Sequence, residues 1–350
     1  MNGHIDVKLQ TPQIVYSFTL ERNLTIVRGD GGSGKSYLCE LIEQASQGIE
    51  DVHLLLSREV SYLVLPRDTS DSRTTLPWDK IIASCNNTII FIDETCDCWK
   101  SGYFSKAIQN TTNYYVIFSR NTHADLPYSS KSILYFEKNA DKLVPHISGK
   151  QIYPELSSSM KLHPDLLVTE DEKAGFVFYK HAFDIAVSSA KSKTKICKKL
   201  KTLAAQRQDN ILLIVDGAAF GPEIEQVSML LEAFFSSSYV YLPESFEWLL
   251  LHSPLFYDIP GITSILLDYT DIIDWSQYFS AEQFFTAQLK TLTDDLNMIP
   301  YTKSAESLDS KFLEPDTLQA IKSLIPIDEN DSQATNYFGG SLADGKTTST

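Results

Sequence analysis

Short apolar runs of strand length recur along the first part of the chain. We predict β-strands at these runs, which are Ile14–Leu20, Leu24–Val27, Val52–Leu56, Tyr62–Leu65, Thr88–Ile92, Tyr114–Phe118 and Ser132–Phe136. Apolar residues at helical spacing predict helices between several of them, at Lys35–Gln47, Asp79–Ser84 and Tyr103–Gln109. Strands that alternate with helices indicate a mostly parallel sheet with helices on both of its faces.

The alternation lapses between about Glu137 and Pro164, where Pro, Gly and Ser accumulate, and then resumes. Further strands are predicted at Leu166–Thr169, Ile185–Ser188, Ile211–Val215 and Tyr239–Leu242, and further helices at Lys173–Phe183, Lys195–Ala205 and Glu223–Phe235. The short crossovers between them indicate a second βαβ-type unit. After Glu244 the pattern is mainly helical, with amphipathic stretches at Phe246–Leu251, Ala281–Leu296 and Pro315–Leu324.

These patterns divide the chain into five parts. We expect an α/β unit at 1–137, a linker at 138–164, a smaller α/β unit at 165–252, a helical extension at 253–327 and a disordered tail at 328–350. The predicted fold class is therefore α/β, with two sheets and a helical C-terminal extension.

Charge and cysteine content limit the partners and the cellular location that we expect for the protein. The 45 acidic residues outnumber the 30 basic ones, and the net charge of −15 repels nucleic acid unless a local basic patch or a bound metal intervenes. Five cysteines without framework spacing indicate reduced thiols, and we expect a cytoplasmic location. No apolar run approaches the roughly 20 residues that cross a bilayer, and the first ten residues have no signal-peptide core, so no membrane partner is expected.

A glycine-rich segment follows the strand at Leu24–Val27 and precedes the helix that begins at Lys35. It fits G-x-x-x-x-G-K-[ST] at every fixed position, a pattern in which backbone N–H groups surround phosphate oxygens. Lys35 would reach the β- and γ-phosphates and Ser36 would ligate Mg²⁺, whereas a plain β-to-α turn needs neither side chain. The expected nucleotide-binding residues are Gly29, Asp30, Gly31, Gly32, Ser33, Gly34, Lys35, Ser36 and Tyr37.

Two later strands end in polar residues that suit the same site. Asp93 and Glu94 follow Thr88–Ile92, an arrangement that looks like a Walker B strand, in which Asp93 orders the Mg²⁺ shell and Glu94 activates water. The strand at Tyr114–Phe118 leads to Asn121, which resembles the γ-phosphate sensor of AAA-type ATPases. Arg120 is the alternative sensor, and an ordinary polar strand end accounts for the residues equally well.

Residues 10–136 resemble the broad ATPase class of P-loop proteins. GTPases carry N-K-x-D and D-x-x-G motifs, whereas this chain has no N-K-x-D and offers Asp93-Glu94-Thr95-Cys96 at the second position. No L-S-G-G-Q signature of transporter ATPases precedes Asp93. The resemblance therefore implies ATP and Mg²⁺ as cofactors, with Lys35 and Glu94 as the catalytic residues.

Acidic residues follow three predicted strands of the second unit: Glu170, Asp216 and Glu244. Carboxyl ends of parallel strands open on one edge of a sheet, where carboxylates could bind Mg²⁺. Solvated acidic strand ends are the alternative explanation.

This arrangement over about residues 165–250 resembles the topoisomerase–primase (Toprim) domain, which has Glu after its first strand and D-x-D after its third. The combination with an N-terminal ATPase is similar to the overcoming-lysogenisation-defect nucleases. The resemblance implies that Glu170 and Asp216 are metal ligands. The second Asp of D-x-D is Ala218 in this chain, and Glu223 or Glu244 would have to substitute for it.

A run of lysines within Lys191–Lys201 precedes the strand that ends at Asp216. It could contact the phosphate backbone of DNA or RNA, or it could form a solvated helix face. The lysines of this run are Lys191, Lys193, Lys195, Lys198, Lys199 and Lys201.

The favoured hypothesis is a Mg²⁺-dependent ATPase whose Toprim-like unit binds or cleaves nucleic acid. The alternatives are a non-catalytic, nucleotide-dependent regulator or scaffold with a degenerate Toprim-like unit, and a small-molecule kinase, because a P-loop alone does not choose the phosphoryl acceptor. A homo-oligomer would supply a neighbour's arginine, which many P-loop ATPases need. Arg58, Arg67, Arg73 and Arg120 are the candidates in this chain.

Overall fold

The computed structural model describes residues 3–65, 77–96, 98, 101–121, 123, 125–139, 144–153, 156–157, 159–303 and 308–328. The candidates Arg67 and Arg73 and the predicted disorder of 329–350 fall outside the described residues. Asp328 is described, and its backbone N–H donates to the carbonyl of Leu162 at 2.9 Å.

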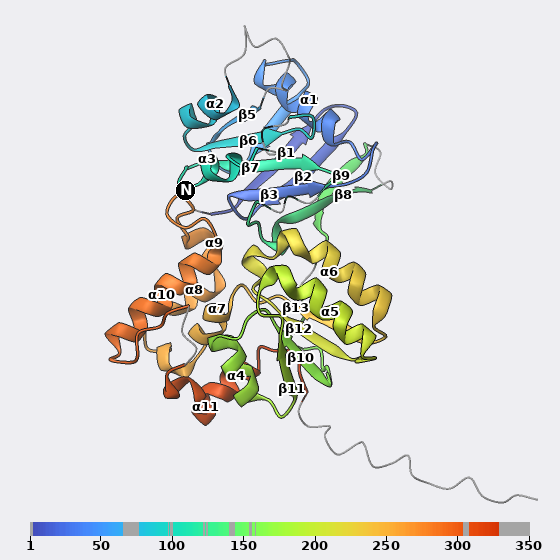
Figure 1. Cartoon of the computed structure of the whole chain (residues 1–350). Coiled ribbons are helices and arrows are strands. Elements are labelled where there is room, and N and C mark those ends of the chain that lie inside the picture. Colours follow the sequence, from blue (N-terminus) through green and yellow to red (C-terminus); the bar gives the residue numbers. More distant parts are fainter. Residues whose placement is uncertain are drawn as a thin grey trace, which may run out of the picture.

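The described chain is an α/β protein with two β-sheets, drawn one above the other in Figure 1. The first sheet has nine strands in the order β4-β1-β2-β9-β8-β3-β7-β6-β5. Their bounds are β1 Ile5–Gln10, β2 Val15–Leu20, β3 Leu24–Arg28, β4 His53–Leu56, β5 Ser61–Val64, β6 Thr88–Ile92, β7 Tyr114–Ser119, β8 Ile133–Asn139 and β9 His146–Gln151.

The first sheet is mixed: most of its strand pairs are parallel, as expected, and antiparallel pairs join its remaining strands. β5, β6, β7, β3 and β8 are parallel neighbours, whereas β8 pairs with β9, and β1 with both β2 and β4, in antiparallel register. β1 was not predicted, although its residues alternate strictly between buried and exposed. β9 was not predicted either and lies within the expected linker 138–164, so part of that segment belongs to the first sheet.

Helices cover both faces of the parallel part of this sheet. α1 (Lys35–Ser46) packs its buried residues with Val27, Phe91 and Phe118 on one face. α2 (Trp78–Ser84) and α3 (Phe104–Ile108) pack on the other face. Because both faces are covered, β6 and β7 are buried at every position, which explains their unbroken apolar sequences.

The second sheet has four parallel strands in the order β11-β10-β12-β13. α5 and α6 cover one face, and α4 and the helices of the extension cover the other. The bounds are β10 Leu166–Thr169, α4 Ala174–Ala182, β11 Ala186–Ser189, α5 Ile196–Ala205, β12 Ile211–Ile214, α6 Gly221–Phe234 and β13 Ser238–Tyr241.

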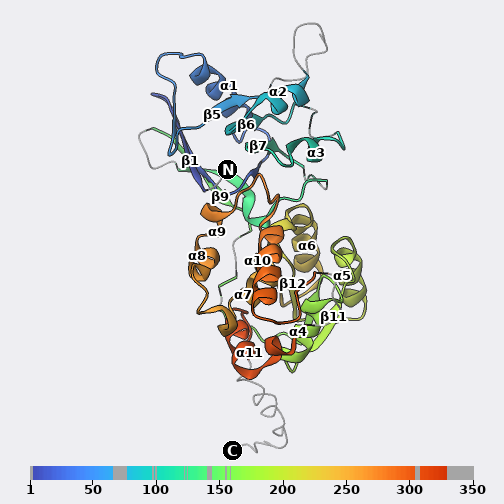
Figure 2. The same cartoon turned by 90° about the vertical axis from the view of Figure 1, so that its left-hand side faces the viewer.

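The chain after β13 is helical, as the periodicity predicted. Its helices are α7 Phe246–Leu251, α8 Ile262–Leu267, α9 Tyr269–Ile272, α10 Ala281–Asp295 and α11 Pro315–Lys322. Figures 1 and 2 both place α9 beside the start of the chain, where the N–H of Gly3 donates to Thr270 at 3.1 Å. The extension therefore contacts both sheet units.

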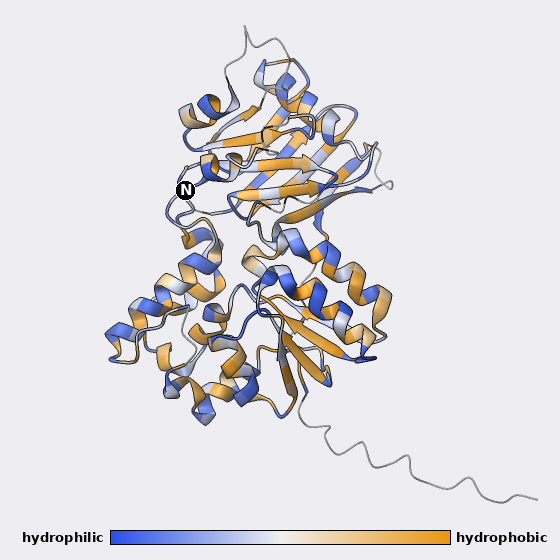
Figure 3. Cartoon of the chain, viewed as in Figure 1, coloured by the Kyte–Doolittle hydropathy of each residue, from blue (hydrophilic) through white to orange (hydrophobic). Residues whose placement is uncertain are grey.

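One apolar cluster joins the two units. It contains Ile26 and Ile117 of the first sheet together with Val168 and Leu213 of the second. Figure 3 shows the strands of both sheets as mainly apolar, with polar residues concentrated on the outer helices. The shared cluster indicates that the two sheets are packed into one body.

Candidate functional site

Three adjacent strand ends form the first candidate site. The strand order β3-β7-β6 brings the glycine-rich loop after β3, Arg120 after β7 and Glu94 after β6 to one edge of the sheet. Because these strands are parallel, their carboxyl ends open in the same direction, which is where ligands bind in α/β sheets. The loop, Glu94 and Arg120 line a single pocket of about 560 Å³.

The backbone of the loop needs glycine at two positions. Gly32 and Gly34 both have a φ of +86°, a left-handed conformation that costs L-residues energy. Gly34 precedes the first turn of α1, and a Cβ there would lie 2.6 Å from the hydroxyl of Tyr16. The Tyr16 hydroxyl also donates to the Gly34 carbonyl at 3.2 Å, so β2 supports the loop directly.

Lys35 bends back over the loop. Its ammonium donates to the carbonyls of Gly29 and Asp30 and, at 3.0 Å, to the hydroxyl of Ser33. Burial lowers the pKa of Lys35, while nearby Glu94 acts in the opposite direction. The side chain is thus a poorly hydrated cation within the loop, which suits it to an anionic ligand.

The two acidic residues after β6 have different environments. Asp93 is 1% exposed, and its Oδ1 accepts from the N–H of Thr95 at 2.9 Å and from its hydroxyl at 2.8 Å. Glu94 lines the pocket, and its Oε1 lies 2.9 Å from Nη2 of Arg120. Arg120 also lies next to Gly31, so it connects the loop to the acidic strand end.

The pocket has an apolar wall that sequence reasoning missed. Tyr16 of β2 and Phe136 of β8 line it with their rings 5.6 Å apart, and Ile147 of β9 lies beside them. Two of these strands had been predicted, but nothing in their sequences indicated that they would lie beside the loop. β9 and its position next to β2 result from the mixed pairing of the sheet.

Most predicted residues of this site meet in the pocket. Ser36 and the exposed Tyr37 line it together with the loop. Asn121 does not line it; its backbone N–H and carbonyl bond to the hydroxyl of Ser119. Arg120, the alternative sensor, is the residue that the fold brings to the pocket.

The second candidate site lies at the carboxyl edge of the second sheet. Glu170 follows β10 and Asp216 follows β12, the two neighbouring strands at which the strand order reverses. Both line a small pocket of about 50 Å³ together with Glu247 of α7. The expectation that Glu170 and Asp216 share one edge is therefore met by the geometry.

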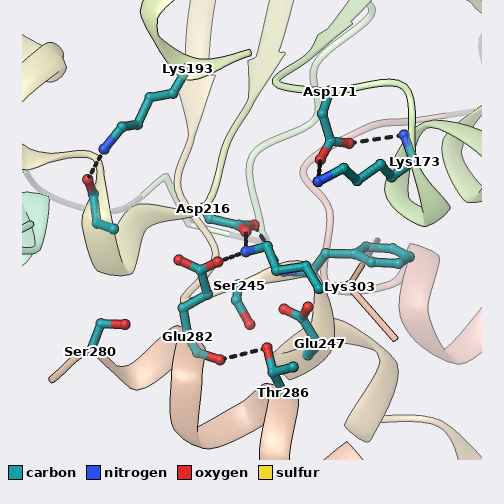
Figure 4. A network of polar contacts seen from close by, with 12 residues as sticks. Asp171, Lys173, Lys193, Asp216, Ser245, Glu247, Ser280, Glu282, Thr286 and Lys303 are labelled. Atoms are coloured by element: carbon teal, nitrogen blue, oxygen red, sulfur yellow. Dashed lines mark hydrogen bonds and ion pairs between the residues drawn. The ribbon is translucent and has the colours of Figure 1, made fainter. Parts of the chain in front are cut away.

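A lysine of the extension enters this acidic pocket. Nζ of Lys303 lies 3.5 Å from Oδ2 of Asp216 and contacts the carboxylate of Glu282 on α10 (Figure 4). Burial raises the pKa of Asp216 to about 7, although Lys303 opposes the shift. Burial also raises the pKa of Glu170, and the surrounding carboxylates keep that of Lys303 above its usual value despite desolvation.

Glu244 does not join these residues. Its buried carboxylate accepts from Nη2 of Arg22 at 2.8 and 3.0 Å, and Nζ of Lys131 lies 2.6 Å away. Arg22 and Lys131 belong to the first unit, so Glu244 is an inter-unit ion pair rather than a metal ligand. Glu223, the other possible substitute for the missing aspartate, lies 3.6 Å from Nζ of Lys193. Within the described ranges, no group of three His, Cys, Asp or Glu residues is arranged to hold a metal ion.

The lysine run is divided between internal contacts and solvent. Lys193 donates to the carbonyl of Ala219 at 3.1 Å, and Lys191 lies 3.7 Å from Glu172. Lys195, Lys198 and Lys201 are exposed. Only part of the run is therefore available to an anionic partner.

Comparison of the sequence with protein-family models finds no match, and comparison with curated proteins finds none either. In the part of the chain that the structure describes, no helix has the length and apolar character needed to cross a membrane. The functional argument therefore depends on the geometry of the two sites.

Proposed function

We propose that the first unit binds and hydrolyses ATP with Mg²⁺, as a P-loop ATPase does. The observation that carries the proposal is the meeting of the glycine-rich loop, Lys35 and Glu94 in one pocket. Its volume of about 560 Å³ lies within the range of small-ligand sites. Triphosphate oxygens would replace the loop carbonyls as acceptors for the Lys35 ammonium.

The residues present fit this assignment. The left-handed glycines leave the loop amides uncovered by Cβ atoms, and α1 begins directly behind them. Ser36 and Asp93 would hold Mg²⁺, which lowers the barrier to phosphoryl transfer by neutralising developing charge. Glu94 would orient the attacking water once its ion pair with Arg120 opens, and Arg120 would then be available to the γ-phosphate.

The apolar wall gives the site a place for a nucleobase. The rings of Tyr16 and Phe136, with exposed Tyr37 nearby, offer flat surfaces beside the loop. An aromatic base stacks favourably on such rings. This wall supports a nucleotide as the ligand in preference to inorganic polyphosphate.

For the second unit we propose a Toprim-like fold that contacts DNA or RNA through the exposed lysines Lys195, Lys198 and Lys201. A cleaving role is not supported, because no three-carboxylate group among the described residues is arranged for a metal. The second candidate function, a nucleotide-dependent regulator with a degenerate Toprim-like unit, is favoured by the lysine that enters the acidic pocket.

The test of the first unit is ATP binding by calorimetry and phosphate release without any added acceptor. Lys35→Ala should weaken ATP binding about 10- to 100-fold, because a charge-assisted contact to phosphate is lost. Glu94→Gln should keep the affinity and slow hydrolysis by about 10²-fold or more. Lys80→Ala and Glu40→Gln, both at exposed helix positions, are the matched controls.

The outcomes separate the hypotheses. Unchanged ATP affinity in Lys35→Ala would refute the site. Full turnover in Glu94→Gln would remove the water-activating role from that residue. Binding without phosphate release would favour the regulator, and release that requires an added acceptor would favour a kinase.

A further inference from the structure

Several carboxylates lie close together at the acidic pocket of the second sheet, and their negative charge needs a compensating cation. Glu170, Asp216 and Glu247 line it, and Glu282 lies at its border. Like charges that are held together out of water are costly unless a cation compensates them. A divalent metal ion can supply the compensating positive charge at such an edge. In this chain a lysine side chain supplies it.

Lys303 is positioned as that cation. Its Nζ lies 3.5 Å from Asp216 and contacts Glu282 (Figure 4). The preceding segment is docked beside it, because the hydroxyl of Tyr301 donates to Oε1 of Glu247 at 2.9 Å and its N–H donates to Thr293 at 3.0 Å. The extension thus brings the ammonium group to the sheet edge two residues after Tyr301, which these bonds anchor.

The remaining space does not suit a hydrated metal. The pocket volume of about 50 Å³ accommodates a few water molecules. Mg²⁺ keeps several of its waters when proteins bind it through one or two carboxylates. A divalent ion and the Lys303 ammonium would therefore compete for the same space and the same oxygens.

One acceptor in the pocket is left over. Glu247 is 1% exposed, and its Oε2 has no hydrogen-bond partner among the described residues. Lys303 therefore does not use all of the ligand oxygens that the edge offers. Removing the ammonium would leave Glu170, Asp216 and Glu247 with unbalanced charge and an unused oxygen.

We propose that Lys303 is a built-in counter-ion that takes the place of a divalent cation at the carboxyl edge of the second sheet and keeps this edge closed to metal. The proposal does not depend on nucleotide binding by the first unit. It makes the extension, through a single lysine, the element that decides whether the sheet edge can hold a metal.

The test is Mn²⁺ binding to the full chain without nucleotide, followed by electron paramagnetic resonance of the free ion. Ser36→Ala is present in every sample, so that the loop hydroxyl of the first unit contributes no ligand. The chain with Lys303 intact should show no binding at the second sheet. Lys303→Gln should gain a Mn²⁺ site whose affinity is at least about tenfold above any residual binding in the chain with Lys303 intact, whereas Lys303→Arg, which keeps the charge, should gain none.

Separate controls test where the gained Mn²⁺ site lies and whether each variant folds. Adding Asp216→Asn to Lys303→Gln should abolish the gained site, and circular dichroism reports whether each variant folds. If Lys303→Gln does not fold, Glu282→Gln removes one partner of Lys303 and should give an intermediate gain. Mn²⁺ binding at Asp216 with Lys303 intact, or no gain in a folded Lys303 or Glu282 variant, would overturn the proposal.

Discussion

Tyr16 and Gly34 show how a single contact shapes the glycine-rich loop. The tyrosine hydroxyl occupies the space that a Cβ at residue 34 would need. Gly32 has the same φ of +86°, but a Cβ there would meet nothing within 4 Å. A comparison of alanine substitutions at Gly32 and Gly34 therefore distinguishes backbone strain, which both share, from steric overlap, which occurs only at Gly34.

We predict that Gly34→Ala destabilises the protein more than Gly32→Ala. Both should lose about 1–2 kcal/mol through the left-handed φ, and Gly34→Ala should lose more through its overlap with Tyr16. Urea unfolding measures both free energies. Adding Tyr16→Phe should recover part of the loss in Gly34→Ala but none in Gly32→Ala, and equal effects would show that the tyrosine does not restrict the loop.

At the residue scale, the sequence identified the side chains with recognisable spacing and missed those without it. Lys35 and Glu94, which line one pocket, could be singled out because Lys35 ends a glycine pattern and Glu94 closely follows a strand. Tyr16 and Lys303 have no local signature, because their roles come from neighbours that are distant in the chain. For the same reason the sequence did not show that Glu244 lies apart from Glu170 and Asp216, since nothing in the sequence indicates that Arg22 will pack against it.

Helix α10 shows what local sequence does control at the scale of elements. The hydroxyl of Ser280 accepts from the N–H of Gln283 at 3.3 Å, and the Gln283 side chain accepts from the N–H of Phe279 at 2.9 Å. This reciprocal pair satisfies the N–H of Gln283 in the first turn and the N–H of Phe279 just before the helix. Glu282, which holds Lys303, lies in the same turn.

We predict that Ser280→Ala lowers the free energy of unfolding by about 1 kcal/mol through loss of the cap. Thr291→Ala, at an exposed position of the same helix, is the control and should change it by less than about half that amount. Thermal or urea unfolding measures the difference. Equal changes in the two variants would mean that the cap does not contribute.

Strand β9 marks the limit of prediction at this scale. Its sequence contains Gly149, at which a Cβ would lie 2.6 Å from Cβ of Phe18. The glycine that made the segment look like a linker is thus required by close packing against β2. A local pattern cannot distinguish these two uses of glycine, because the second depends on the neighbouring strand.

The ion pair between Arg22 and Glu244 connects the units at the scale of the whole molecule. The two side chains are 4% and 2% exposed, and Lys131 and Tyr269 add further contacts. Burial alone would raise the pKa of Glu244, but Arg22 and Lys131 lower it to about 2. The charged form of Glu244 is therefore the one that joins the units.

We predict that Arg22→Ala destabilises the protein by about 3–5 kcal/mol, because it leaves a buried carboxylate with less compensation. Glu225→Gln breaks a more exposed inter-unit pair, in which Arg28 contacts a glutamate side chain that is 41% exposed, and should cost no more than about 1 kcal/mol. Urea unfolding compares the two. Similar small losses would mean that the buried pair does not hold the units together.

The same pair predicts a pH dependence. The pKa of Glu244 falls from 4.5 to about 2 on folding, so its contribution is complete above about pH 4.5 and is lost as the pH falls toward 2. The stability difference between the wild-type chain and Glu244→Gln should shrink over this window. A difference that stays constant between pH 5 and 2, within about 0.5 kcal/mol, would contradict the assigned shift.

The sequence by itself determined the α/β class, most strands and helices, and the loop from Gly29 to Ser36. These features depend on residues that are neighbours in the chain, so their periodicity and spacing are visible without a structure. Only the tertiary structure decided that the first sheet is mixed, that Glu244 pairs with Arg22, and that Lys303 enters the acidic pocket. These contacts join residues far apart in the chain. Packing of the whole molecule decides which of the many charged or apolar residues come together.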